Sequence, residues 1–385
     1  MDHGDKNKKV SIENTIIGVL FIFFLLFSMI FTTINSIESC KKSKEAGGVI
    51  EAWNMDYDID SNLKVNVFAK QEYLNLQGYI SKTIDQRELN DVIKLNNGDL
   101  TSVQQKATDE ALNSNVEILA NIQDYLERKG IKFIYVRAPY KISIFDSQLP
   151  EGVIDYSADN SERFVELLDQ FNINYIDIGL EMHNDGLNQY DYYYKTDHHW
   201  TPEGGLYAFS KIDEEIKNEL GITEENKYTD INSYDIEVYK DWHLGSNGQR
   251  VGVYYAGADD MHYIKPKEDV IIRDVTTQET DSFSKLLYDE SVLIKRDYEQ
   301  RLTYDTLYGA AMGHQLHNDS AINSIKVMVS TDSMGKVVVP YMVLSYEDVY
   351  WTGISKELID EYKPDVVVMI KYQDSETVSD SIDFY

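Results

Sequence analysis

The sequence predicts an α/β domain, a parallel sheet flanked by helices with a large insertion, preceded by one N-terminal transmembrane helix. Three observations lead to this fold class. Residues 16–34 carry no charge, residues 103–178 alternate between helical and strand-like patterns, and the same alternation returns over residues 325–370 after a less regular insertion over residues 220–320. Helices and strands that alternate with short connections are typical of a parallel sheet covered by helices.

The uncharged stretch over residues 16–34 is 19 residues long, which is enough to cross a bilayer as a helix. Lysines lie on both sides of it, so the charge bias that orients such a helix is weak. A long domain that follows a single N-terminal anchor is usually translocated. We therefore expect a single-pass protein of the cell membrane, with residues 1–15 in the cytoplasm, residues 35–60 as a tether and residues 61–385 as an extracellular domain.

The elements of this domain follow from the hydrophobic period. Apolar residues recur at three-four spacing before Gly130, which is a good helix stop, and Pro202 suits the first turn of a helix. Before the insertion we expect helices over residues 103–128, 161–171 and 202–219, and strands over residues 131–137 and 173–178. Within and after it we expect strands over residues 251–255, 270–273, 325–329 and 364–370, a sharp turn over residues 330–335 and a helix over residues 336–344.

The charge balance excludes one class of partner. The chain has 36 lysines and arginines against 66 aspartates and glutamates, a formal net charge of −30. Such a surface repels phosphate backbones, so no nucleic acid partner is expected. Cys40 is the only cysteine of the chain, so no intrachain disulfide can form.

Residues that can carry chemistry gather in four consecutive positions, Asp197, His198, His199 and Trp200, just before the helix expected from Pro202. A carboxylate beside an imidazole supplies two of the three members of a catalytic triad. In such a triad the base takes the proton of a nucleophile, and the acid fixes the tautomer of the base. The run therefore predicts an acid and a base that need a nucleophile from elsewhere in the chain.

Ser333 is the best candidate for that nucleophile. It stands four residues after the apolar strand over residues 325–329 and ahead of a glycine and a helix. In such a turn, backbone N–H groups at the start of the helix point toward the hydroxyl and could stabilise an oxyanion. The alternative is that Ser333 or Asp332 only caps the helix. Ser246 is a rival nucleophile, but its flanks lack the strand before and the helix after.

A metal site is another interpretation of the same run. Adjacent histidines rarely ligate one zinc ion, and a partner ligand at helical spacing is missing. His314 and His317 are spaced as a weak metal pair and are more typical of surface polar residues. The residues alone thus leave three alternatives: a triad, a metal-dependent hydrolase that uses His198 and His199, and a loop with hydrogen-bonded histidines.

The run from Thr196 to Gly204, Thr-Asp-His-His-Trp-Thr-Pro-Glu-Gly, resembles the signature of the bacterial DHHW protein family. That family is similar to the alginate O-acetyltransferases, whose SGNH-hydrolase-like domain carries an Asp-x-His-Trp motif and a later Gly-Asp-Ser motif. The resemblance spans about residues 100–385 and implies an SGNH-hydrolase-like fold.

The resemblance also implies roles for individual residues. Asp197 matches the triad acid, His199 the base and Ser333 the nucleophile, while His198 receives no role. Thr331 stands where the family usually has glycine, which predicts a tighter turn before Ser333.

The resemblance implies acyl-ester chemistry: a membrane-anchored Ser-His-Asp acyltransferase that transfers an O-acetyl group to an extracellular or cell-wall polysaccharide. The acyl donor would be a multi-span membrane O-acyltransferase, and neither a cofactor nor a metal is implied. The alternatives are a carbohydrate esterase of the same fold and a non-catalytic surface protein that binds a glycan or a partner. Trp200, Trp242 and Tyr254 are candidate substrate-binding residues, because aromatic rings form platforms for sugars; the same rings also serve in protein cores.

Overall fold

The computed structural model describes residues 16–35, 69–298, 303–378 and 384, and its contacts divide the chain into two units, residues 1–76 and 77–385. In the first unit, the helix Ile16–Asn35 is long and apolar enough to cross a membrane. It coincides with the uncharged stretch that the sequence analysis identified. The expected cytoplasmic tail and nearly all of the expected tether lie outside the described residues.

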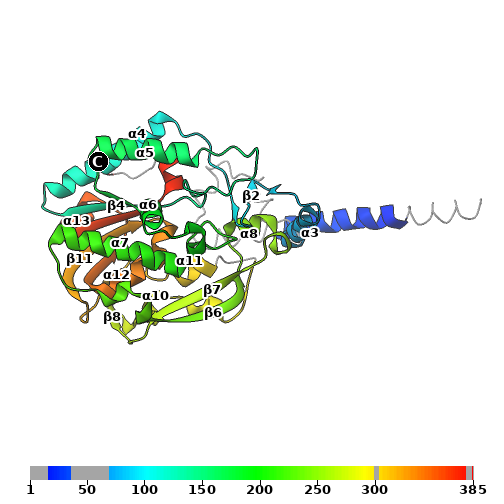
Figure 1. Cartoon of the computed structure of the whole chain (residues 1–385). Coiled ribbons are helices and arrows are strands. Elements are labelled where there is room, and N and C mark those ends of the chain that lie inside the picture. The colour runs from blue at the N-terminus through cyan, green and yellow to red at the C-terminus, as the bar shows by residue number, and fades with distance from the viewer. Residues whose placement is uncertain (1–15, 36–68, 299–302, 379–383, 385) are drawn as a thin grey trace, which may run out of the picture. The chain divides into compact units, whose positions relative to one another are not determined.

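The second unit is built on an eight-stranded sheet with the order β5-β4-β13-β11-β12-β10-β8-β9 (Figure 1). Its first five strands run parallel to one another: β5 (Tyr175–Asp177), β4 (Lys132–Ala138), β13 (Val366–Tyr372), β11 (Asn323–Thr331) and β12 (Tyr346–Trp351). The predicted α/β fold with a parallel sheet is therefore confirmed. β12 is a strand that the sequence analysis did not identify.

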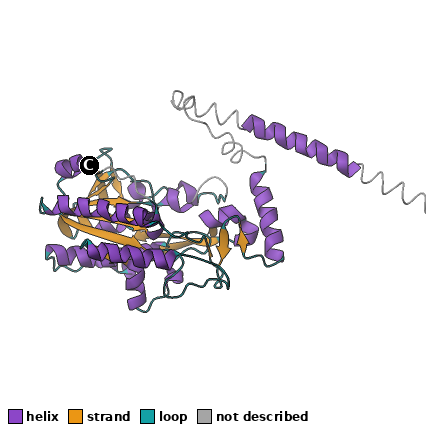
Figure 2. Ribbon diagram, turned by 90° about the horizontal axis from the view of Figure 1, so that it is seen from above, coloured by secondary structure: helices purple, strands orange, loops and turns teal. Residues whose placement is uncertain are grey.

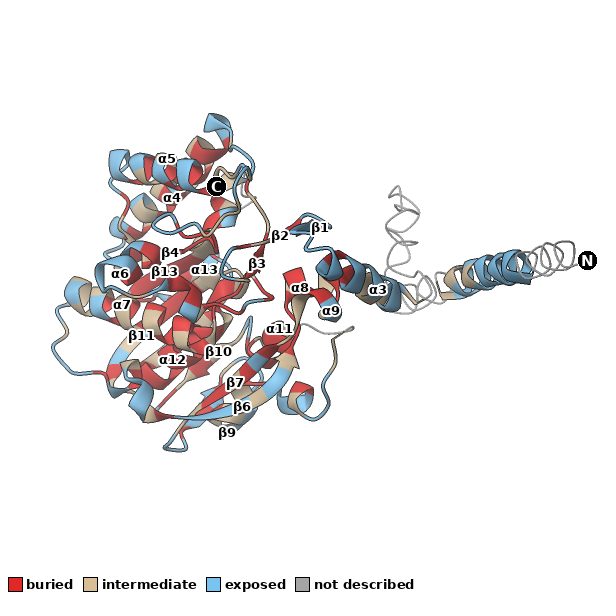
Figure 3. Ribbon diagram, turned by 45° about the vertical axis from the view of Figure 1, so that its right-hand side comes forward, coloured by how far each residue is buried: buried red, intermediate tan, exposed pale blue. Residues whose placement is uncertain are grey.

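The central strands β4 and β13 are buried on both faces. Successive side chains of a strand point to opposite faces, and helices cover each face. In β4, Ile134 and Val136 join one core cluster, whereas Phe133 and Tyr135 join another. The first cluster includes residues of α6 (Ile178–Asn184), α7 (Pro202–Leu220) and α12 (Val339–Ser345); the second includes residues of α4 (Asp109–Glu127), α5 (Ser157–Gln170) and α13 (Lys356–Tyr362). The helices pack along the strands in Figure 2, and Figure 3 shows the buried strands between helices whose outer faces are exposed.

The insertion contributes to the sheet itself. Its strands β10 (Gln315–His317), β8 (Ile271–Asp274) and β9 (Thr280–Ser282) continue the sheet beyond β12 through antiparallel pairings. A separate antiparallel pair, β6 (Tyr234–His243) and β7 (Asp259–Pro266), forms a two-stranded sheet. The strand expected over residues 270–273 is confirmed as β8.

The strand expected over residues 251–255 is wrong. Two short helices, α8 (Ser246–Val251) and α9 (Val253–Ala256), meet there at Gly252. Val251 and Tyr255, four residues apart, pack together against Leu89, Val92 and Leu100. Packing on the small sheet of β1 (Glu88–Leu89), β2 (Val92–Lys94) and β3 (Leu100–Thr101) thus overrides the strand propensity of valine and tyrosine.

The ends of the elements follow their capping residues. α4 begins later than expected because Thr108 acts as its N-cap and accepts a hydrogen bond from the Ala111 N–H. α7 begins at Pro202 as expected. β11 runs to Thr331, so the sharp turn starts at Asp332, and the short helix η6 (Ser333–Val337) precedes α12. The other described helices include α3 (Lys70–Thr83), α10 (Phe283–Leu287) and α11 (Thr303–Leu307).

Candidate active site

The serine turn lies at the carboxyl edge of the parallel strands. Asp332 and Ser333 directly follow β11, beside the ends of β4 and β13. Asp332 caps η6: its Oδ1 accepts from the Met334 N–H (2.9 Å), and its Oδ2 accepts from the Tyr372 N–H at the end of β13 (2.7 Å). Burial raises the pKa of Asp332, although these backbone donors oppose the shift. This edge of an open α/β sheet is where ligands usually bind, and the turn places Ser333 there.

Two backbone donors of this turn are already used. The N–H groups of Met334 and Gly335 donate to the side chain and to the carbonyl of Asp332, respectively. The expectation that N–H groups after Ser333 would stabilise an oxyanion is therefore wrong for these two groups. The tight turn that Thr331 predicted is present, because a Cβ at Gly335 would lie 1.9 Å from Thr331 Oγ1.

The loop that carries the acid and the two histidines is closed by an antiparallel bridge between Tyr193 and Trp200. Lys141, just after β4, is fully buried, and its ammonium group fixes this loop from inside. It donates to three of the loop's carbonyl oxygens, those of Tyr194, Lys195 and Asp197. Burial lowers the pKa of Lys141, while the nearby carboxylates, Asp99 foremost, oppose the shift.

Asp197, His199 and Ser333 come together in space, although 134 residues separate the histidine from the serine. His199 Nε2 lies 2.6 Å from Ser333 Oγ, and His199 Nδ1 lies 3.2 Å from Asp197 Oδ1. The second contact is close, but its angle is not that of a well-directed hydrogen bond. Because Nδ1 faces the carboxylate, the neutral ring carries its proton on Nδ1 and offers the lone pair of Nε2 to the serine hydroxyl.

The environment of Asp197 keeps it ionised. Burial alone would raise its pKa, but the charge of His199 and the close ring nitrogens of His198, His199 and His243 hold the pKa well below its ordinary value. A carboxylate that stays ionised at neutral pH can orient an imidazole and stabilise the imidazolium that forms when the ring takes a proton.

Sequence reasoning missed two partners of this carboxylate, both near the end of β6. His243 Nε2 lies 2.9 Å from Asp197 Oδ2, and both side chains are fully buried. The Ser246 hydroxyl, considered above only as a rival nucleophile, donates to Asp197 Oδ1 at 2.7 Å. Gly245 permits this approach, since a Cβ there would lie 2.3 Å from Asp197 Cβ. The only available signal was a histidine and a serine close to glycines in a loop of the insertion.

Trp200 is fully buried, so the prediction that it binds substrate is wrong. Its indole N–H donates to the Met334 carbonyl (2.8 Å) and ties the loop of the acid to the serine turn. Tyr304 of α11 makes a second tie: its ring stacks on that of His199, with centroids 4.2 Å apart, and its hydroxyl donates to the Ser333 carbonyl (3.1 Å). The indole is thus a structural support of the site.

The other two candidate substrate-binding residues lie elsewhere. Trp242 is half-buried; its indole N–H donates to the Val292 carbonyl (3.0 Å) and its ring packs on Tyr239. Tyr254 is 60% exposed on α9. Among the described residues, no interaction joins Trp242 or Tyr254 to the triad, so their role in binding a substrate stays a prediction.

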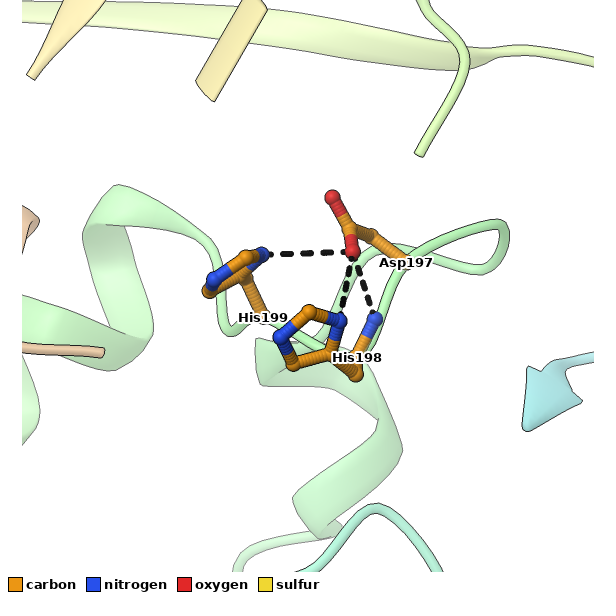
Figure 4. Close-up of side chains that lie close together, drawn as sticks. All are labelled: Asp197, His198 and His199. Carbon is orange, nitrogen blue, oxygen red and sulfur yellow. Dashed lines mark hydrogen bonds and ion pairs between the residues drawn. The ribbon is translucent and has the colours of Figure 1, made fainter. Parts of the chain in front are cut away.

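Asp197, His198 and His199 also have the spacing of metal ligands, since one ligand atom of each lies within 4.8 Å of the others (Figure 4). The carboxylate oxygen that both histidines face is, however, already occupied by donors. Asp197 Oδ1 receives the Ser246 hydroxyl and the His198 backbone N–H, both at 2.7 Å, and the Nδ1 atoms of both histidines approach it. A cation on this oxygen would have to displace these donors, so the geometry fits a hydrogen-bonded triad better than a metal centre.

The parallel α/β sheet, with serine, histidine and aspartate side chains at its carboxyl edge, is the arrangement that the SGNH-hydrolase-like fold class leads us to expect. Residues 99–289 match the family described as "SGNH hydrolase-like domain, acetyltransferase AlgX", so this part of the chain is similar to the domains of that family. The resemblance based on the run from Thr196 to Gly204 is therefore confirmed. The matched range contains Asp197 and His199 and ends before Ser333. No curated protein matches the chain.

Solved structures share the fold at low sequence identity. Bacillus cereus PatB1 has a TM-score of 0.59 and 18% identity, over 74% of this chain and 97% of that chain. The structure of PatB1 with a sulfonyl adduct has a TM-score of 0.59 and 15% identity, over 76% and 97%. A DHHW family protein from Eubacterium siraeum DSM 15702 has a TM-score of 0.54 and 16% identity, over 75% and 93%. At these identities the likeness shows the fold alone.

Proposed function

We propose that this protein is a membrane-anchored acyltransferase with Ser333 as nucleophile, His199 as base and Asp197 as acid, and that it transfers an O-acetyl group to an extracellular or cell-wall polysaccharide. The observation that carries the proposal is the 2.6 Å approach of His199 Nε2 to Ser333 Oγ, with Asp197 on the other side of the ring. The match to an acetyltransferase domain supports acetyl as the transferred group.

The reaction has two halves that use the same base. Ser333 Oγ attacks the acetyl carbonyl of the donor while His199 Nε2 takes the serine proton, and the imidazolium then protonates the departing alcohol of the donor. In the second half, His199 takes a proton from a sugar hydroxyl as that hydroxyl attacks the acetyl-serine. The proton then returns to Ser333 Oγ as the new ester leaves. Asp197 stabilises the imidazolium in both halves.

The apolar helix Ile16–Asn35 would anchor the domain and keep it beside a membrane-bound donor, for which a multi-span O-acyltransferase is the natural partner. The two halves require no cofactor. Hydrolysis would differ only in the acceptor, because His199 would activate water in the same way. A carbohydrate esterase is therefore the alternative that the experiment below must separate from a transferase.

The test uses the full-length chain in detergent with 4-nitrophenyl acetate as donor. We expect release of 4-nitrophenol, an acetyl group on Ser333 by mass spectrometry, and acetylated product when an alcohol acceptor is added. Ser333→Ala should lower the release by at least about 10³-fold without changing the circular dichroism spectrum. Ser330→Ala, three positions earlier on β11, is the matched control and should retain activity.

Four outcomes decide between the alternatives. Turnover that Ser333→Ala leaves intact would contradict the proposed nucleophile, and no turnover at all would favour a non-catalytic surface protein. Acetyl-Ser333 that reacts only with water would identify an esterase. Loss of activity on chelation, together with stoichiometric metal in the purified protein, would favour the metal-dependent hydrolase.

A further inference from the structure

His198, the residue without an assigned role, is the only histidine of its loop with a large exposed part. Its side chain is 34% exposed, whereas those of His199 and Asp197 are 1% and 0% exposed. The His198 ring lies directly against the His199 ring, with centroids 3.8 Å apart, and 5.6 Å from that of Tyr372. His198 is therefore an accessible imidazole immediately beside the base that faces Ser333.

The hydrogen bonds around His198 determine the tautomer of its neutral ring. The Ser246 hydroxyl has a single proton, and it donates that proton to Asp197 Oδ1. His198 Nδ1 lies 2.7 Å from Ser246 Oγ and 3.1 Å from Asp197 Oδ1, both of which act as acceptors toward it. His198 Nδ1 must therefore carry a hydrogen, and in the neutral ring the lone pair is on Nε2.

This arrangement leaves Nε2 of His198 available. In Figure 4 the Nδ1 side of the ring faces Asp197, and the other ring nitrogen points away from the carboxylate. Among the described residues, none forms a hydrogen bond with His198 Nε2. Ser246 and Asp197 thus hold the His198 ring through Nδ1 and leave Nε2 on the opposite side. A hydroxyl can hydrogen-bond to this Nε2 whether the ring is neutral or protonated. A hydroxyl donates to the neutral ring and accepts from the protonated ring.

We propose that His198 Nε2 binds a second hydroxyl of the acceptor sugar, next to the hydroxyl that becomes acetylated. The inference deepens the proposed function and rests on it. In the second half of the reaction, His199 Nε2 must receive the proton of the attacking hydroxyl, so an acceptor gains orientation only through a further contact. A vicinal diol supplies that contact, whereas water and a simple alcohol do not. His198 therefore makes the site selective for polyols.

The test compares two acceptors that differ by one hydroxyl, 1,2-ethanediol and ethanol, each at the same concentration, with full-length protein and 4-nitrophenyl acetate. We expect the wild type to transfer acetyl to the diol about tenfold faster than to ethanol, as one added hydrogen bond predicts. His198→Asn is the diagnostic variant, because its amide can occupy the place of Nδ1 but has no atom at the place of Nε2. It should transfer to diol and ethanol at rates within about twofold of each other.

Two control variants make the result interpretable. His198→Gln, whose amide reaches the place of Nε2, should regain part of the diol preference, and His317→Ala, on β10, should behave as wild type. A diol preference that survives in His198→Asn overturns the inference. The inference is also overturned if His198→Asn lowers acetyl-Ser333 formation, transfer to the diol and transfer to ethanol by the same factor. That result would mean that His198 only positions Asp197. A wild type whose Ser333 takes no acetyl group overturns the proposed function itself, and the mass spectrum of the protein distinguishes that failure.

Discussion

Asp197 is the residue on which the site converges, because three histidines and one serine direct nitrogen or oxygen atoms at its two carboxylate oxygens. His243 holds Oδ2, the oxygen that the other partners leave. Its own Nδ1 is buried without a hydrogen-bond partner, so the Asp197 contact is the one polar interaction of this ring among the described residues. Because the buried His243 ring makes this one polar contact, we infer that it positions the Asp197 carboxylate.

His243→Leu should therefore weaken both stability and chemistry. It leaves Asp197 Oδ2 buried without its donor, which costs about 1–3 kcal/mol and lowers the melting temperature. The less oriented carboxylate should lower kcat by about 10–100-fold. His243→Gln, whose amide reaches the position of Nε2, should restore most of the melting temperature and most of kcat. Thermal unfolding and acetyl-ester kinetics measure the two quantities.

A packing role alone predicts a different pattern for the same residue. If His243 only fills space, the leucine variant should keep the kcat of the wild type per folded molecule and an unchanged pH profile. A positioning role instead lowers kcat per folded molecule in His243→Leu and restores it in His243→Gln.

At the scale of elements, α7 is joined to β7 by a charged pair, with His262 Nδ1 2.5 Å from Glu203 Oε1. The hydrogen bond that His262 donates to Glu203 raises the pKa of His262 above its ordinary value. Burial would raise the pKa of Glu203, but the hydrogen bond and charge of His262 lower it. The pair therefore couples the helix that follows the acid loop to the insertion in a pH-dependent way.

The sign of this dependence follows from the two shifts. The stabilisation of the folded state by His262 is fully present below its unfolded pKa of about 6.5. It is lost as the pH rises through the higher pKa of the folded state. The contribution of Glu203 is complete above its unfolded pKa of about 4.3 and is lost as the pH falls through its lower folded pKa. The pair is thus most stabilising between about pH 4.5 and pH 6.5.

Glu203→Gln should lower the melting temperature most at about pH 5.5 and much less at pH 9, where His262 is neutral in the wild type too. Thermal unfolding of both proteins across this range measures the difference. Glu214→Gln, an exposed change on the same helix, serves as the control and should show no such pH dependence. An equal loss at both pH values would contradict the pairing.

At the scale of the whole molecule, the buried guanidinium of Arg137 ties the sheet to the last described turn of the chain. Arg137, at the end of β4, pairs with Asp177 at the end of β5 and with Glu376 of η7 (Gln373–Thr377). The pair with Glu376 is bidentate, with both contacts at 2.8 Å. Glu376 is buried and Asp177 is partly buried, and the guanidinium offsets the cost of removing their charges from water.

Arg137→Met should lower the free energy of unfolding by about 3–5 kcal/mol, because it leaves Asp177 and Glu376 buried without their partner. Urea unfolding measures the loss. Arg163→Met removes an exposed arginine, paired with Glu166 on α5, and should change stability by less than about 1 kcal/mol. Equal effects of the two substitutions would contradict the proposal that the Arg137 ion pairs stabilise the fold.

The sequence analysis succeeded where a feature depends on neighbours along the chain. A hydrophobic period or a helix-breaking residue predicts each of these elements: the helix from Pro202, the strands on either side of the sheet centre and the turn that carries Ser333. It failed at residues 251–255, where a strand-like composition folds as two short helices because of what lies against it. It also gave the fully buried Trp200 a surface role, since a single aromatic residue carries no period from which burial can be read.

The candidate acid, base and nucleophile and the parallel α/β class could thus be predicted from linear patterns, because adjacent residues and short apolar repeats encode them. The assembly of the site could not. His243 and Ser246 on Asp197, Lys141 inside the loop, and Tyr304 against His199 are all contacts between distant segments. A repeat along a strand or helix reveals which of its faces is buried but not which partner buries it. That choice is made only when the insertion packs back onto the carboxyl edge of the sheet.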